Sequence, residues 1–92
     1  MSVYVDSVRI KWKGKIWCHL VADSLSELHN FASMIGLKRS WFQNKRSCPH
    51  YDICLSKKHK AVELGAIEID KRMMAKKISQ IRRSLREETQ AA

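Results

Sequence analysis

The stretch from Ile16 to Gly36 constrains the fold more than any other part of the chain. It begins with an almost continuous apolar run, which predicts a buried β-strand. Ser24 and Glu27 then match a capping box, in which the serine hydroxyl accepts a hydrogen bond from the glutamate amide. Apolar residues at helical spacing continue to Ile35, and Gly36 stands where a left-handed C-terminal cap is favoured. The pattern predicts a buried strand that leads directly into a helix.

Shorter patterns predict the remaining elements. We expect strands over 3–6 and 66–69, a strand or turn over 50–53, and helices over 56–64 and from 71 onward. Residues 9–15 are expected to form a basic loop or a hairpin tip, and residues 37–49 a loop. Ser56 and Asp70 are the expected N-caps of the two later helices. The fold class is therefore α/β or α+β: a small three-stranded sheet packed by two short helices, plus a long basic C-terminal helix.

The C-terminal helix is predicted to be amphipathic. Its apolar stripe comprises Met74, Ile78, Ile81 and Leu85, and the cations opposite are Arg72, Lys76, Arg83 and Arg86. We expect one domain, with a compact unit over 1–70 and this helix over 71–92. The stripe can pack on the sheet, on a partner or on a second copy in a homodimer, and the sequence leaves these alternatives open.

Composition limits the expected partners, location and disulfide content. The chain has 18 Lys and Arg against 9 Asp and Glu, a net charge of +9, which attracts nucleic acid, nucleotides or an acidic protein. No apolar stretch approaches the roughly 18 residues of a membrane span, and no signal-peptide pattern is present. We therefore expect a cytoplasmic protein that has no membrane partner. The odd number of cysteines, 3, favours free thiols over disulfides.

A set of histidines and acids recurs at the boundaries of the predicted elements. Its members are His19, Asp23, His29, His50 and Asp52. Such groups can form a hydrogen-bonded buried network, line a pocket for a metal-free ligand, or hold a divalent metal. Their spacing matches no standard metal motif, and the spacing of Cys48, His50 and Cys54 does not match a zinc knuckle. No cofactor is therefore predicted, although a divalent metal stays an alternative.

Two segments interleave cations with aromatic rings, as surfaces that bind phosphates and stack bases do. They are 11–13, around Trp12, and 38–42, which contains Arg39, Trp41 and Phe42. The plainer interpretation is that the rings fold onto the core while the cations are solvated.

The chain also resembles a small bacterial and phage family known only as domain of unknown function 4031. The resemblance rests on the runs Trp17–Asp23, Glu27–Ala32, His50–Asp52 and Gly65–Ala66, together with Gly36, Arg39 and Phe42. It covers about residues 3 to 69. The family brings no activity, but it implies a signature formed by His19, Asp23, Glu27, His29, Arg39, His50, Tyr51 and Asp52.

Three functional hypotheses follow. The first is a domain without enzyme activity that binds a phosphate-bearing ligand, either a nucleotide or nucleic acid. In this hypothesis Arg39 clamps phosphate, Tyr51 or Trp41 stacks on a base, and the histidines donate hydrogen bonds. The second is a metal-dependent phosphoester hydrolase or nuclease that uses His19, Asp23, His50 and Asp52. The third is an inhibitor that docks its basic helix on an acidic host protein. The resemblance implies that such a protein is a phage accessory acting on host processes.

Overall fold

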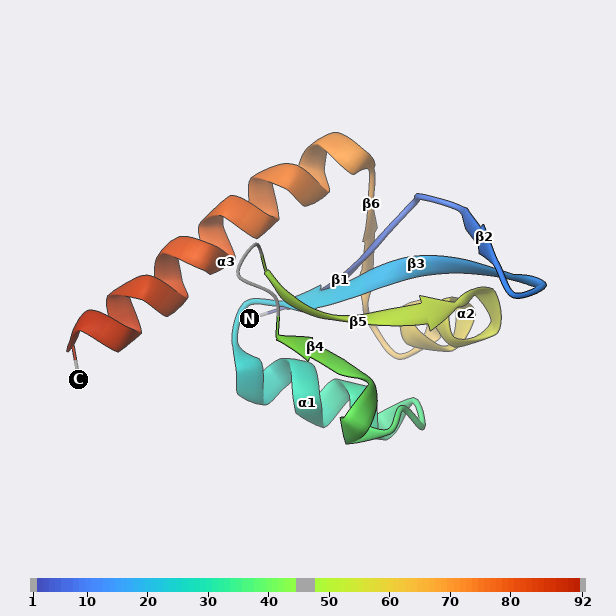
Figure 1. Cartoon of the computed structure of the whole chain (residues 1–92), viewed down its shortest axis with the longest axis horizontal. Helices are drawn as coiled ribbons and strands as arrows, with labels where there is room; N and C mark the ends of the chain where they lie inside the picture. Colours follow the sequence, from blue (N-terminus) through green and yellow to red (C-terminus); the bar gives the residue numbers. More distant parts are fainter. Residues whose placement is uncertain (1, 45–47, 92) are drawn as a thin grey trace.

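A computed structural model describes residues 2–44 and 48–91, with side chains described as far as residue 84. This part of the chain forms six strands and three α-helices (Figure 1). In order they are β1 (Val3–Asp6), β2 (Ile10–Trp12), β3 (Lys15–Ala22), α1 (Leu25–Met34), the 3₁₀ turn η1 (Arg39–Trp41), β4 (Phe42–Asn44), β5 (Pro49–Cys54), α2 (Leu55–Glu63), β6 (Ile67–Ile69) and α3 (Lys71–Ala91).

Strand β3 is the centre of a single mixed sheet. The strand order is β4-β5-β3-β1-β6, and β2 pairs with the first residues of β3, beyond the end of β1. The pair β1–β6 is parallel, and the other pairs are antiparallel. The mixed class is as predicted, but the expected three-stranded sheet was wrong, because the described sheet has six strands. Strands β2 and β4 are only three residues long, Ile-Lys-Trp and Phe-Gln-Asn, which is too short to establish an alternating pattern in the sequence.

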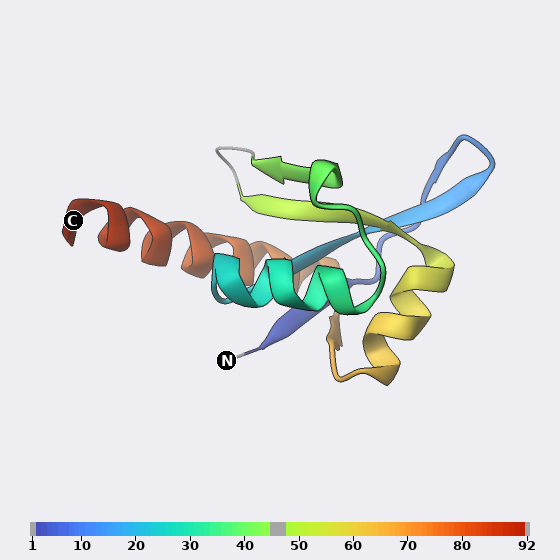
Figure 2. The same cartoon turned by 90° about the horizontal axis from the view of Figure 1, so that it is seen from below.

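The face of the sheet towards α1 and α2 carries the main core (Figure 2). Side chains of β3 alternate, so Cys18, Leu20 and Ala22 point to this face and meet Tyr51 and Ile53 of β5. The two helices contribute buried residues to the same cluster, namely Leu28, Phe31, Ala32, Ile35 and Ala61. The strand and helix predicted over 16–36 are confirmed, and together they supply much of this core.

The opposite face of the sheet is only partly covered. Met74 and Ile81 of α3 are buried against Tyr4 and Val21, and Ile78 packs beside them. The predicted stripe thus packs on the sheet over its described members, while the side chain of Leu85 lies outside the described residues. Helix α3 contacts the β1 side of this face (Figure 1). The side formed by β3 and β5 carries His19, His50 and Asp52.

Local capping agrees with two of the three predicted helix starts. Ser24 accepts a hydrogen bond from the Glu27 amide at 3.2 Å, and Asp70 accepts one from the Met73 amide at 2.8 Å. Ser56 is not the cap, because α2 already begins at Leu55 and its N-cap residue is Cys54. Helix α2 follows β5 without an intervening loop, so the chain has no free position for a capping serine.

The Asp70 cap gives a testable prediction for the anchoring of α3. Replacing Asp70 by Ala should lower the free energy of unfolding by about 1 kcal/mol, because the Met73 amide loses its acceptor. Urea denaturation followed by circular dichroism measures this change. Asp70→Ser keeps an acceptor and is the control. Equal stability of the Ala and Ser variants would contradict the capping role.

Candidate metal centre on the open face of the sheet

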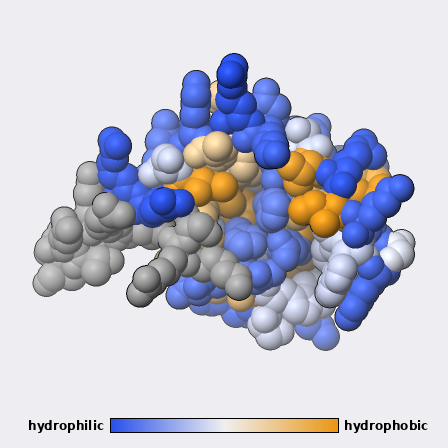
Figure 3. Space-filling model, turned by 45° about the horizontal axis from the view of Figure 1, so that its top comes forward, coloured by the Kyte–Doolittle hydropathy of each residue, from blue (hydrophilic) through white to orange (hydrophobic). Residues whose placement is uncertain are grey.

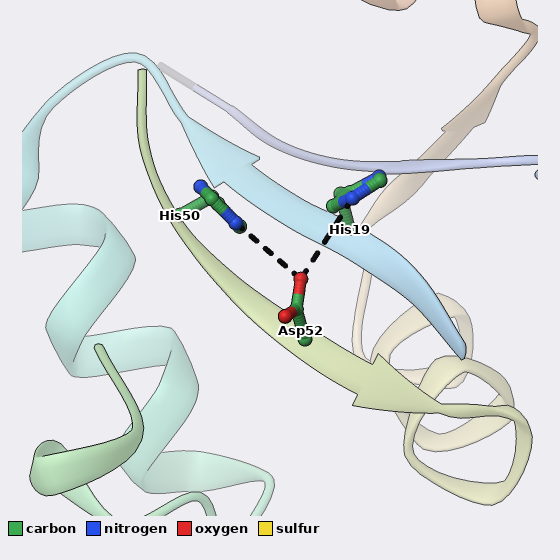
Figure 4. A group of neighbouring side chains, drawn as sticks. All are labelled: His19, His50 and Asp52. Atoms are coloured by element: carbon green, nitrogen blue, oxygen red, sulfur yellow. Dashed lines mark ion pairs between the residues drawn. The ribbon is translucent and has the colours of Figure 1, made fainter. Parts of the chain in front are cut away.

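Two histidines and an aspartate meet on the open face of the sheet (Figure 4). His19 lies on β3 directly opposite Asp52 of β5, and His50 lies two residues before Asp52, so alternation points both β5 side chains the same way. The Asp52 Oδ1 atom is 3.3 Å from Nε2 of His50 and 3.7 Å from Nε2 of His19. The predicted common orientation of His50 and Asp52 is confirmed.

A buried carboxylate, Asp6 at the end of β1, fixes the position of His19. Its Oδ2 atom is 2.7 Å from the ring Nδ1 of His19, and its Oδ1 accepts the His19 backbone amide at 3.0 Å. The Asp6 side chain is only 3% exposed, whereas the His19 ring is 34% exposed. The hydrogen bond that His19 donates to Asp6 raises the pKa of His19 above its ordinary 6.5, although burial of the ring acts in the opposite direction.

Hydrogen bonds also fix the other two members of the site, His50 and Asp52. His50 Nδ1 lies 3.0 Å from the backbone carbonyl of Cys48, which can only accept, so this nitrogen carries the proton. The Gln43 amide of β4 donates to Asp52 Oδ2 at 2.5 Å, which leaves Oδ1 towards the histidines. The imidazoles of His19 and His50 stand edge to face, with 5.4 Å between ring centroids.

These contacts decide which atoms of the site are available. Each histidine uses Nδ1 as a donor to an oxygen acceptor, so in the neutral ring Nε2 bears a lone pair. Both Nε2 atoms and Asp52 Oδ1 lie within 4.8 Å of one another. Three electron-pair donors that converge in this way repel one another unless a proton or a cation lies between them. The arrangement can therefore bind a metal ion or share protons.

Three other predicted site residues lie on the opposite face of the sheet, towards α1. The Tyr51 hydroxyl bonds to Nδ1 of His29 at 2.9 Å, and both rings contact Phe42. Arg39 lies over the Phe42 ring, 5.9 Å from its centroid. Burial raises the pKa of Tyr51, while burial and the charge of Arg39 lower that of His29. The sheet thus separates His29, Arg39 and Tyr51 from His19, His50 and Asp52.

Asp23 and Trp41 lie away from the histidine pair. Asp23 Oδ2 accepts the Ser2 amide at 2.8 Å and the Tyr4 hydroxyl at 3.4 Å, so this acid holds the first strand to the turn after β3. Trp41 is half exposed and lines a cavity of about 510 Å³ that Asp52 also lines. The three cysteines are free thiols, as predicted, and none belongs to the His–Asp group found among the described residues.

Two residues of the site, Asp6 and Gln43, were not predicted from the sequence. The signal for Asp6 was present: it ends an apolar alternating strand, on the same face as Tyr4, where an unpaired acid is costly. Its role also depends on the register of β1 and β3, which sets Val5 opposite Leu20 and so brings Asp6, the next residue, beside His19. Gln43 gave no signal, because its strand was expected to be part of a loop.

Comparison with known proteins assigns the family. The family model described as "Protein of unknown function (DUF4031)" matches residues 3–81. The chain belongs to the DUF4031 family. The match extends past the expected limit at 69 and includes the first half of α3, so this helix is part of the DUF4031 pattern over that range. No curated protein and no solved structure matches the chain. None of the helices in the described part of the chain is long and apolar enough to cross a membrane.

The three thiols should differ in reactivity with pH. Burial raises the pKa of Cys18 to about 12 and that of Cys48 to about 11. Partial burial of Cys54 is outweighed by hydrogen bonds from Ser56 and from backbone amides, so its pKa lies below the ordinary 9.0. The reactive species is the thiolate, so iodoacetamide at neutral pH should label Cys54 first.

Peptide mass mapping after timed labelling measures the order of reaction. The Cys54→Ser variant should show almost no early labelling. Labelling of Cys18 or Cys48 at the rate of Cys54 in the folded protein would contradict the burial described for those two thiols.

Proposed function

We propose that this protein binds a divalent metal ion through His19, His50 and Asp52 and uses it to hydrolyse phosphate esters. One observation carries the proposal: both imidazoles have Nδ1 engaged by an oxygen acceptor, and their Nε2 atoms converge on a carboxylate oxygen. Histidines that bind metals usually donate their second nitrogen to a carboxylate or a backbone carbonyl in this way. His19 has the first kind of partner, Asp6, and His50 has the second, the carbonyl of Cys48.

The separations suit a small ion. Ligand atoms at about 2.1 Å from one metal lie roughly 3.0–3.4 Å apart for angles between octahedral and tetrahedral. The distance from Asp52 Oδ1 to Nε2 of His50, 3.3 Å, lies in this range, and the distance to Nε2 of His19, 3.7 Å, is longer by a few tenths of an ångström, so a small movement of one side chain would complete the site. Two imidazoles and one carboxylate are a donor set for Zn²⁺, Mn²⁺ or Fe²⁺, and three protein ligands leave coordination positions for water and substrate.

Phosphoester hydrolysis is the reaction that this setting favours. A bound divalent ion would polarise a phosphoryl oxygen and lower the pKa of a water ligand. Water adds its oxygen to phosphorus, the ester P–O bond breaks, and the leaving alcohol takes up the proton that the water loses. Asp52 and His19 are partly exposed, so a substrate can reach them. The net charge of +9 attracts an anionic substrate from solution.

The hydrolase hypothesis fits the geometry better than a single phosphate-binding pocket. That pocket needed Arg39 and Tyr51 beside His19 and His50, yet these two pairs lie on opposite faces of the sheet. The Tyr51 hydroxyl is bonded to His29, and its side chain is almost fully buried, so it is poorly placed to stack on a base.

The first test combines metal binding with hydrolysis. After treatment with a chelator, the protein should bind one equivalent of Mn²⁺ or Zn²⁺ in isothermal titration calorimetry and then cleave bis(para-nitrophenyl) phosphate. His19→Ala and His50→Ala should each weaken metal binding by at least about 100-fold, since even an outer partner of a ligand contributes about 10–100-fold.

The chain supplies a matched control for these variants. His59 is an exposed histidine on α2, so His59→Ala should bind metal and hydrolyse the diester like the wild type. Metal binding that survives in both ligand variants would rule out the proposed metal centre. Metal binding without any diester cleavage would support the metal centre and rule out the hydrolase function.

A second prediction concerns the buried partner of His19. Asp6→Asn keeps an oxygen to accept the His19 amide but removes the negative charge behind the ring. Metal affinity should fall by about 10–100-fold, which the same calorimetry measures. Asp23→Asn, an equivalent change at an acid that contacts Ser2 and Tyr4, should leave the affinity unchanged. Equal affinities for both variants would show that Asp6 does not support a ligand.

A further inference from the structure

A groove leads away from the candidate metal centre across the surface. A cavity of about 160 Å³ lies on the open face and is lined by Ile10, Trp12, Trp17, Cys18, His19 and Asp52. A larger cavity of about 510 Å³ shares Trp12, Trp17 and Asp52 with the first and reaches Trp41 of η1. The two cavities therefore form one groove, which we call the tryptophan groove, with a proposed metal ligand at the junction of its two halves.

Two indole rings in this groove face solvent. Trp12 is 58% exposed and Trp41 is 47% exposed. The Trp17 ring is held by a hydrogen bond from its Nε1 to the Trp12 carbonyl at 2.9 Å and stands edge-on to the Trp12 ring. This contact holds the hairpin end of the groove in shape and leaves Trp12 available. Large exposed apolar surfaces of this kind commonly mark binding sites.

Each exposed indole has a lysine beside it. The Nζ atom of Lys13 lies 4.5 Å from the centroid of Trp12, and that of Lys38 lies 5.7 Å from the centroid of Trp41. Lys15 and Lys57 line the larger cavity, in which Asp52 is the one acid among the described lining residues. Figure 3 shows patches of hydrophobic surface between long hydrophilic side chains on the face that it presents. The groove is therefore both aromatic and cationic.

This combination selects one class of occupant. A second copy of the chain would carry the same charge of +9 and be repelled. An acidic peptide would satisfy the lysines but gives no reason for two open indole rings. A single-stranded nucleic acid satisfies both, because its bases stack on aromatic faces while its phosphates lie beside cations. A duplex keeps its bases stacked on one another and cannot offer them to the rings.

We propose that the tryptophan groove binds single-stranded nucleic acid, with bases on Trp12 and Trp41 and backbone phosphates beside the lysines. A metal ion held at Asp52 would then bring one phosphodiester to the His–Asp group. The identification of a phosphodiester as the bond cleaved rests on the proposed hydrolase function. Binding in the groove does not, because the tryptophans and lysines are separate from the His–Asp ligands.

Fluorescence anisotropy with chelator-treated protein tests the groove without the reaction. Labelled DNA and RNA single strands of about 12 nucleotides, and the corresponding duplex, are suitable probes. The single strands should bind more tightly than the duplex, and affinity should fall steeply with salt as counterions are released. Trp12→Ala and Trp41→Ala should each weaken single-strand binding roughly 5- to 150-fold, the range observed for the loss of one base–aromatic stack.

Control variants separate stacking from folding. Trp12→Phe keeps an aromatic face and should retain most of the affinity. Leu64→Ala removes an exposed apolar side chain outside the groove and should change nothing. Lys15→Ala should weaken binding more than Lys60→Ala, which alters an exposed lysine on α2. Cys54 lines the groove, so a bound single strand should also slow its alkylation.

The outcomes distinguish this inference from the proposed function. Unchanged affinity in both tryptophan-to-alanine variants, or binding of the duplex as tightly as the single strand, overturns the groove. Hydrolysis of the small diester without single-strand binding would support the hydrolase function and rule out nucleic-acid binding in the groove. Single-strand binding by the wild type and by His50→Ala, with no cleavage when metal is added, would support binding in the groove and rule out the hydrolase function. The DNA and RNA arms show which nucleic acid is bound.

Discussion

The antiparallel register between β3 and β5 is the constraint on which the rest of the molecule depends. It sets His19 opposite Asp52 and Leu20 opposite Tyr51, so one pairing defines both the polar site and the core. A slip by one residue would turn the apolar side chains of one strand to the open face and bring polar ones under α1 and α2. The burial of Leu20, Tyr51 and Ile53 therefore enforces the geometry of the histidines on the other side.

Much of the fold follows from local sequence rules. The apolar run after Lys15, the Ser24 cap and the Asp70 cap each predict an element that the structure contains. Pairing could not be predicted in the same way, because it joins residues far apart in sequence. Asp6 and His19 are 13 residues apart, and only the β1–β3 register brings them together. Strand β4, and Gln43 with it, was not predicted, because so short a segment with two polar residues forms a strand only when β5 supplies the partner.

The candidate site shows how sequence proximity and spatial proximity differ. His50, Tyr51 and Asp52 are consecutive, yet strand alternation sends the middle residue into the core and the outer two to the open face. The buried Tyr51 hydroxyl needs a hydrogen-bond partner there, and His29 provides it. His29 therefore has a structural role and is not part of the His–Asp group. A resemblance in sequence marks both kinds of position equally, and only their neighbours in space separate them.

The outer strands of the sheet have a further consequence for behaviour at high concentration. Strands β2, β4 and β6 each border the described sheet with only three residues. Such short edges offer few backbone groups to a neighbouring chain, and Lys11 adds a charge in the middle of β2. The long apolar strands, which would template aggregation most readily, are enclosed between them. We therefore expect these three short strands to limit edge-to-edge fibril growth, and two of them, β2 and β4, also line the tryptophan groove.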